Sequence, residues 1–193
     1  MKNILWLPSI LILSLLLVGC GKGIKNPLNW EITDFNYINQ ENEEFGLKDL
    51  KGKVWVADFI FTNCETVCSP MTANMVDLQE KLKEEGLDVE IISFSVDPEM
   101  DTPEMLKEYA IKFDADLSSW NLLTGYSQKS IEEFATKSFK TLVKKPNSNN
   151  QVIHGTSFYL VNQEGKVVKD YNGLSDVPYD LIVNDAKILL SMN

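Results

Sequence analysis

The chain has 193 residues and a formal net charge of −10, from 18 basic and 28 acidic side chains. This length supports a single domain with a real hydrophobic core rather than two domains. All the basic residues are lysines. The acidic excess argues against a nucleic-acid-binding protein, because phosphate binding needs clustered positive charge.

The N-terminal segment has the pattern of a secretory signal. Lys2 precedes an apolar run over residues 4–18, and about 15 residues are fewer than the roughly 20 that span a bilayer as a helix. The run ends in Leu-Val-Gly-Cys, which resembles the lipobox of bacterial lipoproteins. The resemblance implies removal of residues 1–19 and lipid attachment to Cys20; the alternative is an uncleaved anchor with an incidental cysteine. Either way we expect a domain on the extracytoplasmic side of the cell membrane, with residues 20–29 as its tether.

The rest of the chain, residues 30–193, alternates strand and helix patterns. Buried strands show as apolar runs and helices as apolar residues at helical spacing, bounded by caps, glycine or proline. In chain order these patterns predict a hairpin over residues 30–44, a strand at 53–61, a helix at 71–86, a strand at 89–96, a helix opening at 101–104, a strand at 120–123, a helix at 127–137, a loop at 144–151, a hairpin of strands at 157–161 and 166–171, and a last helix at 178–192.

This order of elements predicts the fold class. Alternating strands and helices that end in a hairpin and a helix form an α/β domain whose sheet mixes parallel and antiparallel strands. The order is thioredoxin-like. We therefore expect a thioredoxin-like fold, with helices flanking a mixed central sheet and an added N-terminal hairpin.

Two cysteines directly follow the strand at residues 53–61. Cys64 and Cys68 lie where this strand gives way to a helix. Helical residues four apart have Cβ atoms roughly 5–6 Å apart, which suits two sulfurs that each lie about 2.3 Å from one metal ion. A disulfide needs Cβ atoms roughly 3.5–4.5 Å apart, so it demands a local rearrangement. The spacing therefore allows both states, and a helix N-terminus favours the thiolate.

His154 is the only histidine of the chain. In a thioredoxin-like fold the segment entering the later hairpin lies opposite the start of the active-site helix, and residues 151–156 occupy that entry. Two thiolates and one imidazole suit Cu(I), with room for an added oxygen ligand on Cu(II), whereas a structural zinc site would need a fourth ligand. The alternatives are an ordinary histidine and a structural disulfide. Met71 and Met75 are also soft ligands, but their spacing with Leu78 predicts core positions.

Three segments resemble motifs of the Sco (SCO1/SenC) family and follow one another in that family's order. They resemble its CxxxCP motif, its SVDPxxDTP run and its histidine-bearing segment, at Cys64–Pro70, Ser95–Pro103 and Ile153–Leu160. The resemblance covers about residues 30–190. Ser69 is a departure, because many relatives place proline directly after the second cysteine.

The resemblance implies a copper-binding protein that assists the Cu(A) centre of cytochrome c oxidase subunit II. Copper would be held by Cys64, Cys68 and His154, and the two cysteines would also form a reversible disulfide. The protein would deliver copper, prepare the thiols of the acceptor, or do both. Asp97, at the end of the second buried strand, is either a supporting group or weak oxygen ligand near the metal, or only part of an Asp-Pro turn.

Other functions use the same residues. The main alternative is a thiol–disulfide oxidoreductase or redox sensor that uses Cys64 and Cys68. The CxxxC spacing counts against it, as does the lack of a proline directly before the strand at Ser157. A peroxidase of similar fold would use an arginine, which this chain lacks. A binding lipoprotein with a merely structural disulfide is the last alternative, and a monomer is expected.

Overall fold

The computed structural model describes residues 23–64, 66–146 and 151–192. The predicted signal segment and the predicted lipid site, Cys20, lie outside these residues. None of the helices among the described residues is long and apolar enough to cross a membrane.

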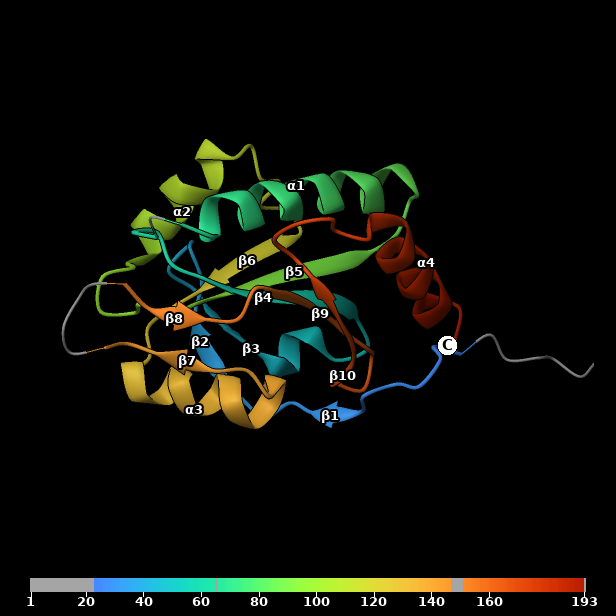
Figure 1. The fold of residues 1–193 in the computed structure, drawn as a ribbon, viewed down its shortest axis with the longest axis horizontal. Coiled ribbons are helices and arrows are strands. Elements are labelled where there is room, and N and C mark those ends of the chain that lie inside the picture. Colours follow the sequence, from blue (N-terminus) through green and yellow to red (C-terminus); the bar gives the residue numbers. More distant parts are fainter. Residues whose placement is uncertain (1–22, 65, 147–150, 193) are drawn as a thin grey trace, which may run out of the picture.

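A six-stranded sheet forms the centre of the domain (Figure 1). Its strand order is β1-β10-β9-β4-β5-β6. Three strands are parallel, namely β4 (Val54–Ile60), β5 (Val89–Ser95) and β6 (Trp120–Leu123). Each of the other three is antiparallel to the neighbour it joins, namely β9 (Ser157–Val161), β10 (Lys166–Asn172) and β1 (Trp30–Glu31). The predicted α/β fold with a mixed central sheet is therefore confirmed.

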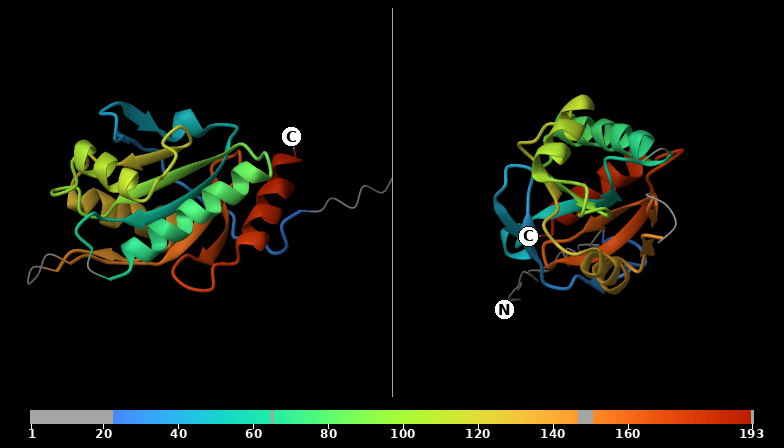
Figure 2. Two further views of the ribbon diagram at one scale, coloured as in Figure 1. Left: turned by 90° about the horizontal axis from the view of Figure 1, so that it is seen from above. Right: turned by 90° about the vertical axis from the view of Figure 1, so that its left-hand side faces the viewer.

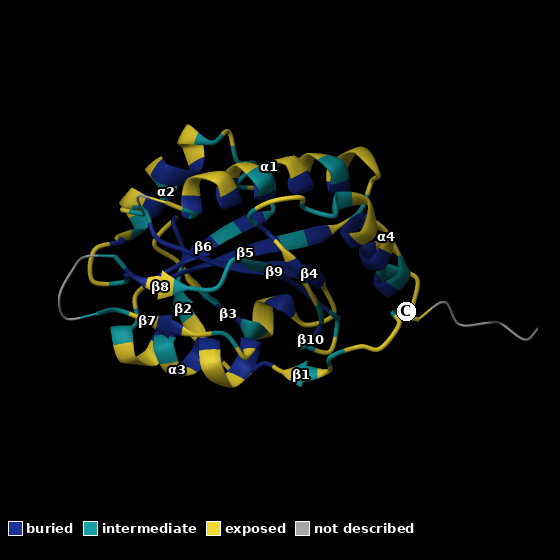
Figure 3. Ribbon diagram, viewed as in Figure 1, coloured by how far each residue is buried: buried dark blue, intermediate teal, exposed yellow. Residues whose placement is uncertain are grey.

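Helices cover both faces of this sheet (Figures 1 and 2). One face carries α1 (Cys68–Glu84), α2 (Pro103–Lys112) and α4 (Tyr179–Leu190), and the other carries α3 (Gln128–Phe139). All seven residues of β4 are buried, because this strand is covered on both sides, and a strand in that position reads as a continuous apolar run. Figure 3 shows this burial along the central strands.

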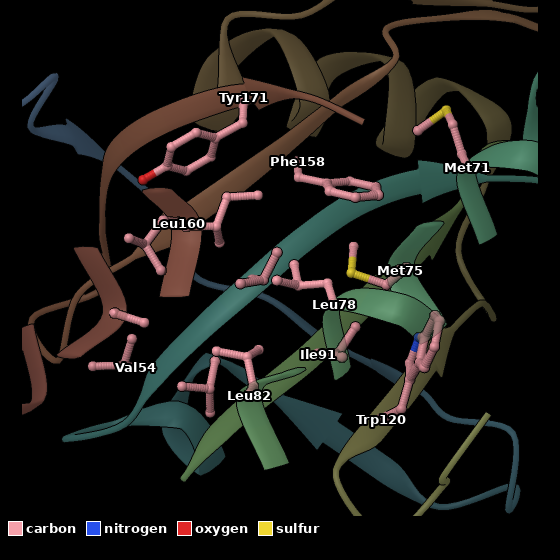
Figure 4. Packing of buried hydrophobic residues seen from close by; sticks show 14 of the residues in the cluster. Val54, Met71, Met75, Leu78, Leu82, Ile91, Trp120, Phe158, Leu160 and Tyr171 are labelled. Atoms are coloured by element: carbon pink, nitrogen blue, oxygen red, sulfur yellow. The ribbon is translucent and has the colours of Figure 1, made fainter. Parts of the chain in front are cut away.

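Two hydrophobic clusters hold the layers together. Side chains alternate along β4, so that Val54 and Val56 face the α1 side while Trp55 and Phe59 face the α3 side. On the α1 side, helix residues at helical spacing pack onto the sheet (Figure 4), namely Met71, Met75, Leu78 and Leu82. Full burial of one such side chain stabilises the fold by about 1.5–3 kcal/mol. The prediction that the two methionines are core residues is confirmed.

Short elements differ from the predictions more than long ones do. The predicted N-terminal hairpin forms between β2 (Asn36–Ile38) and β3 (Glu44–Gly46), and a 3₁₀ helix, η1 (Leu47–Leu50), follows it. Trp30 and Glu31 do not belong to this hairpin, because they join the central sheet as β1. The first residue of the predicted loop at 144–151, Lys144, belongs to β7 (Val143–Lys144), which pairs with β8 (Ile153–His154).

Candidate metal centre

The two cysteines lie on either side of a helix start. β4 ends at Ile60 and α1 begins at Cys68, so Cys68 is helical while Cys64 lies in the preceding loop. Pro70 is tolerated in the first turn because the amides there have no intrahelical acceptor. The residue before the helix, Val67, gives no side-chain cap. Instead the backbone N–H of Cys68 donates to Cys64 Sγ over 3.3 Å, so the sulfur lies at the positive end of the helix dipole.

A narrow β-ribbon brings His154 to this helix start. The ribbon consists of β7 and β8, and His154 is paired with Val143 in it. His154 Nε2 lies 3.3 Å from Cys68 Sγ, and the Gln151 side chain donates to the carbonyl of Asn63 over 3.0 Å. The histidine segment is therefore bound to the cysteine loop by side-chain and backbone contacts, as the thioredoxin-like order predicts.

The three side chains form one ligand set. One ligand atom each from Cys64, Cys68 and His154 lies within 4.8 Å of the other two. Both cysteines are free thiols, with Cys68 buried and Cys64 half-buried. A cavity of about 320 Å³ opens beside Cys64 and His154. Two sulfurs bound to one ion lie roughly 4 Å apart, so these atoms need only small shifts to hold a metal.

A backbone hydrogen bond orients the ring of His154. Its Nδ1 lies 2.9 Å from the carbonyl oxygen of Gly155, and a carbonyl only accepts, so Nδ1 carries the proton and donates it. Nε2 is then the ring nitrogen that faces the sulfurs, 3.3 Å from Cys68 Sγ. An N–H···O=C bond of this kind fixes the ring orientation of a ligating histidine. His154 is therefore oriented to bind a metal through Nε2.

The two thiols differ in acidity. Burial opposes ionisation of Cys64, but hydrogen bonds from His154, Cys68 and backbone amides outweigh it and lower the pKa of Cys64 to about 6. Burial raises the pKa of Cys68 well above its usual value, and its hydrogen bond to Cys64 raises it further. Cys64 is thus the thiolate at neutral pH and Cys68 keeps its proton.

A buried carboxyl group that the sequence interpretation missed lies in the same region of the fold. Asp58 is 0 % exposed in β4 and accepts a 2.6 Å hydrogen bond from Ser93. Burial raises the pKa of Asp58 to about 7, against the lowering effects of Ser93 and of charge on His154. Its negative charge also helps to raise the pKa of Cys68. The signal in the sequence is a single acid within an otherwise apolar strand.

Asp97 has a different environment from the ligand set. It is 1 % exposed, and its carboxylate pairs with Lys145 over 2.7 Å. Its carbonyl accepts from the amides of Met100 and Asp101 over 3.0 and 2.9 Å, which is turn chemistry. The structure therefore unites Cys64, Cys68 and His154 and places Asp97 in a separate ion pair.

Sequence comparisons show a relative of nearly the same length. The chain is 56% identical over 187 residues to the SCO1 protein homolog of Bacillus subtilis, and the match covers 97% of both chains.

Solved structures of related proteins also match this chain. A SCO1/SenC family lipoprotein from Bacillus anthracis is 58% identical with a TM-score of 0.84, covering 86% of this chain and 98% of that one. BsSco, described as a member of the Sco family of cytochrome c oxidase assembly proteins with a disulfide switch, is 56% identical with a TM-score of 0.83, covering 89% and 100%. Copper-bound ScoI of Arabidopsis thaliana is 27% identical with a TM-score of 0.69, covering 82% and 98%.

The family profile described as SCO1/SenC matches residues 26–187. This range contains the central sheet, its covering helices and all three side chains of the ligand set. Together with the near-complete match to the Bacillus subtilis relative, it establishes that the chain belongs to the SCO1/SenC family.

Proposed function

We propose that this protein binds one copper ion as cargo through Cys64 Sγ, Cys68 Sγ and His154 Nε2. The observation that carries the proposal is the convergence of these three soft ligand atoms within 4.8 Å. The donor chemistry fits copper, because thiolate and imidazole are the ligands that Cu(I) and Cu(II) share. A relative of the same fold, Arabidopsis ScoI, has been solved with copper bound.

The copper serves assembly of cytochrome c oxidase, with the Cu(A) site of subunit II as the acceptor. The related BsSco belongs to a family of cytochrome c oxidase assembly proteins, which supports a role in oxidase assembly. The choice of the Cu(A) site as acceptor is supported by the sequence resemblance. Cys64 is half-buried beside an open cavity while Cys68 is buried. An incoming acceptor sulfur therefore reaches the metal from the side of Cys64, and Cys68 is displaced last.

The different acidities of Cys64 and Cys68 favour a second role, as a thiol reductant. Cys64 as thiolate attacks a disulfide of the partner, forming a mixed disulfide and releasing one partner thiolate. Cys68 then gives up its proton and attacks the sulfur of Cys64, which closes the Cys64–Cys68 disulfide and releases the second partner thiol. The partner gains two electrons and this chain loses two. A disulfide switch is described for BsSco, which supports this role.

The domain is anchored at the extracytoplasmic side of the membrane by lipid on Cys20. Residues 1–19 would be removed as a signal and residues 20–29 would act as a tether to the domain at 30–193. The lipobox-like sequence supports this proposal, and the Bacillus anthracis relative is described as a lipoprotein. Cys20→Ala should release the protein from the membrane fraction into the medium. Equal membrane retention of the variant would contradict the lipid anchor.

Titration of the reduced domain with Cu(II) tests the copper site. The family profile begins at residue 26, and 98% of the solved Bacillus anthracis chain matches 86% of this one, so the titration uses the domain from residue 21 on. We expect a one-to-one complex with an intense thiolate-to-copper absorption band and a matching EPR spectrum. The band should disappear in Cys64→Ser, Cys68→Ser and His154→Ala, and it should persist in the exposed control Ser69→Ala. An unchanged spectrum in His154→Ala would remove that residue from the ligand set.

A further inference from the structure

A buried carboxylate connects the ends of the three parallel strands near the metal centre. Asp101 lies after β5 and before α2, and it is 1 % exposed. Its partners are Thr62 after β4, Ser95 at the end of β5 and Thr124 after β6. The carboxyl ends of parallel strands meet at one edge of a sheet. One residue therefore joins all three segments at the edge from which the Cys64 loop leaves.

Asp101 accepts hydrogen bonds through both carboxylate oxygens and through its backbone carbonyl. Thr62 donates its hydroxyl to Asp101 Oδ1 over 2.6 Å and its backbone N–H over 3.2 Å. Ser95 donates its hydroxyl to Oδ2 over 2.6 Å, and this hydroxyl also accepts from the amide of Asp97. Thr124 donates to the Asp101 carbonyl over 2.7 Å. Charge-assisted bonds of this length are among the stronger ones in proteins.

Thr62 is the link between this carboxylate and the metal centre. It precedes Cys64 by two residues, and the intervening residue, Asn63, accepts a hydrogen bond at its carbonyl from Gln151 of the histidine segment. Cys64 belongs to neither β4 nor α1. The position of its sulfur therefore depends on contacts that fix the loop, and Asp101 supplies two of them through Thr62.

We propose that Asp101 is a positioning residue for the metal centre, which holds the Thr62–Cys64 loop so that Cys64 stays in reach of Cys68 and His154 as a free cysteine. The expected effect on copper affinity rests on the proposed copper function, whereas the expected effect on the dithiol–disulfide equilibrium needs no metal. Asp101 itself does not touch the ligand atoms, because its carboxylate contacts Thr62 and Ser95.

Two measurable consequences follow from loosening the loop. Copper binding weakens, because the ligand atoms are no longer held in place before the metal arrives. The dithiol is also favoured less, because the Asp101–Thr62 contacts belong to the dithiol state, while disulfide formation requires the loop to rearrange. Loss of groups that support ligands typically costs about 10–100-fold in metal affinity. We expect changes near tenfold in both equilibria.

The experiment uses the domain from residue 21 on and four variants. Asp101→Asn weakens the link by removing the charge and replacing one acceptor oxygen with an amide donor, Thr62→Val removes its hydroxyl bond, and Thr62→Ser keeps that hydroxyl. Ser95→Ala is the matched control, because it removes an equally short bond to the same carboxylate from β5 rather than from the cysteine loop. Copper affinity is measured by competition with a chelator. The dithiol–disulfide equilibrium is measured against dithiothreitol. When the protein disulfide is reduced to the dithiol, dithiothreitol is oxidised to its cyclic disulfide, and two electrons and two protons pass to the protein.

Asp101→Asn and Thr62→Val should bind copper about tenfold more weakly, and their dithiol–disulfide equilibrium should shift about tenfold toward the disulfide. Thr62→Ser should restore both values, and Ser95→Ala should stay within about twofold of wild type although it unfolds at lower urea. If all three link-breaking and control variants lose stability but keep wild-type affinity and equilibrium, Asp101 is merely structural. If the wild type binds no copper, the proposed function fails, and the metal-free equilibrium alone decides the role of Asp101.

Discussion

Reaction of Cys64 with a small disulfide at different pH values probes the site directly. The reagent is 4,4′-dithiodipyridine, and the protein is the metal-free, reduced domain. With a pKa of about 6, Cys64 is half ionised at pH 6. A free cysteine with a pKa of about 8.5 is ionised to roughly 0.3% there. The advantage in thiolate fraction is therefore about 160-fold at this pH.

The lower basicity of the Cys64 thiolate offsets part of this advantage. Thiolate reactivity falls with pKa by a Brønsted coefficient of about 0.4–0.5, so a difference of about 2.5 units costs roughly 13-fold. Cys64 should react about tenfold faster than free cysteine at pH 6 and about tenfold slower at pH 9, with a crossover near pH 7.5. Half-burial lowers the rate at every pH and leaves the midpoint of the profile unchanged.

Stopped-flow absorbance of the released pyridine thione measures the rate. Two thiones per protein should appear, because Cys68 attacks the mixed disulfide formed at Cys64. A profile with its midpoint near pH 8.5 would refute the assignment of Cys64 as the thiolate. Modification of Cys68 first, identified by mass spectrometry, would refute the assignment of Cys68 as the proton-bearing thiol.

Three further predictions concern the metal centre and the core. His154→Ala removes a hydrogen bond that lowers the pKa of Cys64, so the midpoint of the same profile should rise; an unchanged midpoint would show that other contacts set the acidity. Met75→Ala empties a fully buried position and should cost about 2–5 kcal/mol in urea unfolding, whereas a loss below about 0.5 kcal/mol would contradict its place in the core. Asp58 has a folded-state pKa of about 7, above its ordinary value, so its stabilising contribution is present in acid and is lost as the pH rises from about 4 through 7. Asp58→Asn should therefore gain stability relative to wild type between pH 5 and pH 8, and a constant difference in the free energy of unfolding would contradict the raised pKa.

Long, uniform patterns made most of the fold predictable. β4 is apolar on both faces because it lies between two helical layers, and α1 repeats its buried residues at helical spacing from Met71 to Leu82. The pairing of β1 with β10 could not be predicted, because a strand of two residues has no period and its partner lies far along the chain. The same reason applies to β7 and β8.

The candidate site was predictable in its members and less so in its geometry. The motif placed Cys64, Cys68 and His154 together, and the structure brings their ligand atoms within 4.8 Å. The helical spacing used for the two cysteines was wrong for Cys64, because α1 begins at Cys68 and the sulfur of Cys64 accepts from its first amide. Hydropathy gives no signal for that cap. The contacts of Asp97 and Asp58 depend on tertiary packing, which a single sequence does not contain.

The three ligands are held by different parts of the fold. Cys64 and Cys68 belong to the junction of a buried strand and a long helix, while His154 lies on a ribbon whose strands β7 and β8 pair over two residues each. A two-stranded ribbon of this kind has little stability of its own. A copper ion bound by all three side chains would cross-link the ribbon to the start of α1. Copper binding would therefore stabilise the ordered conformation of the ribbon. Loaded and empty protein would therefore present different surfaces to a partner that touches the ribbon, and slower hydrogen exchange at β8 in the loaded protein would reveal the difference.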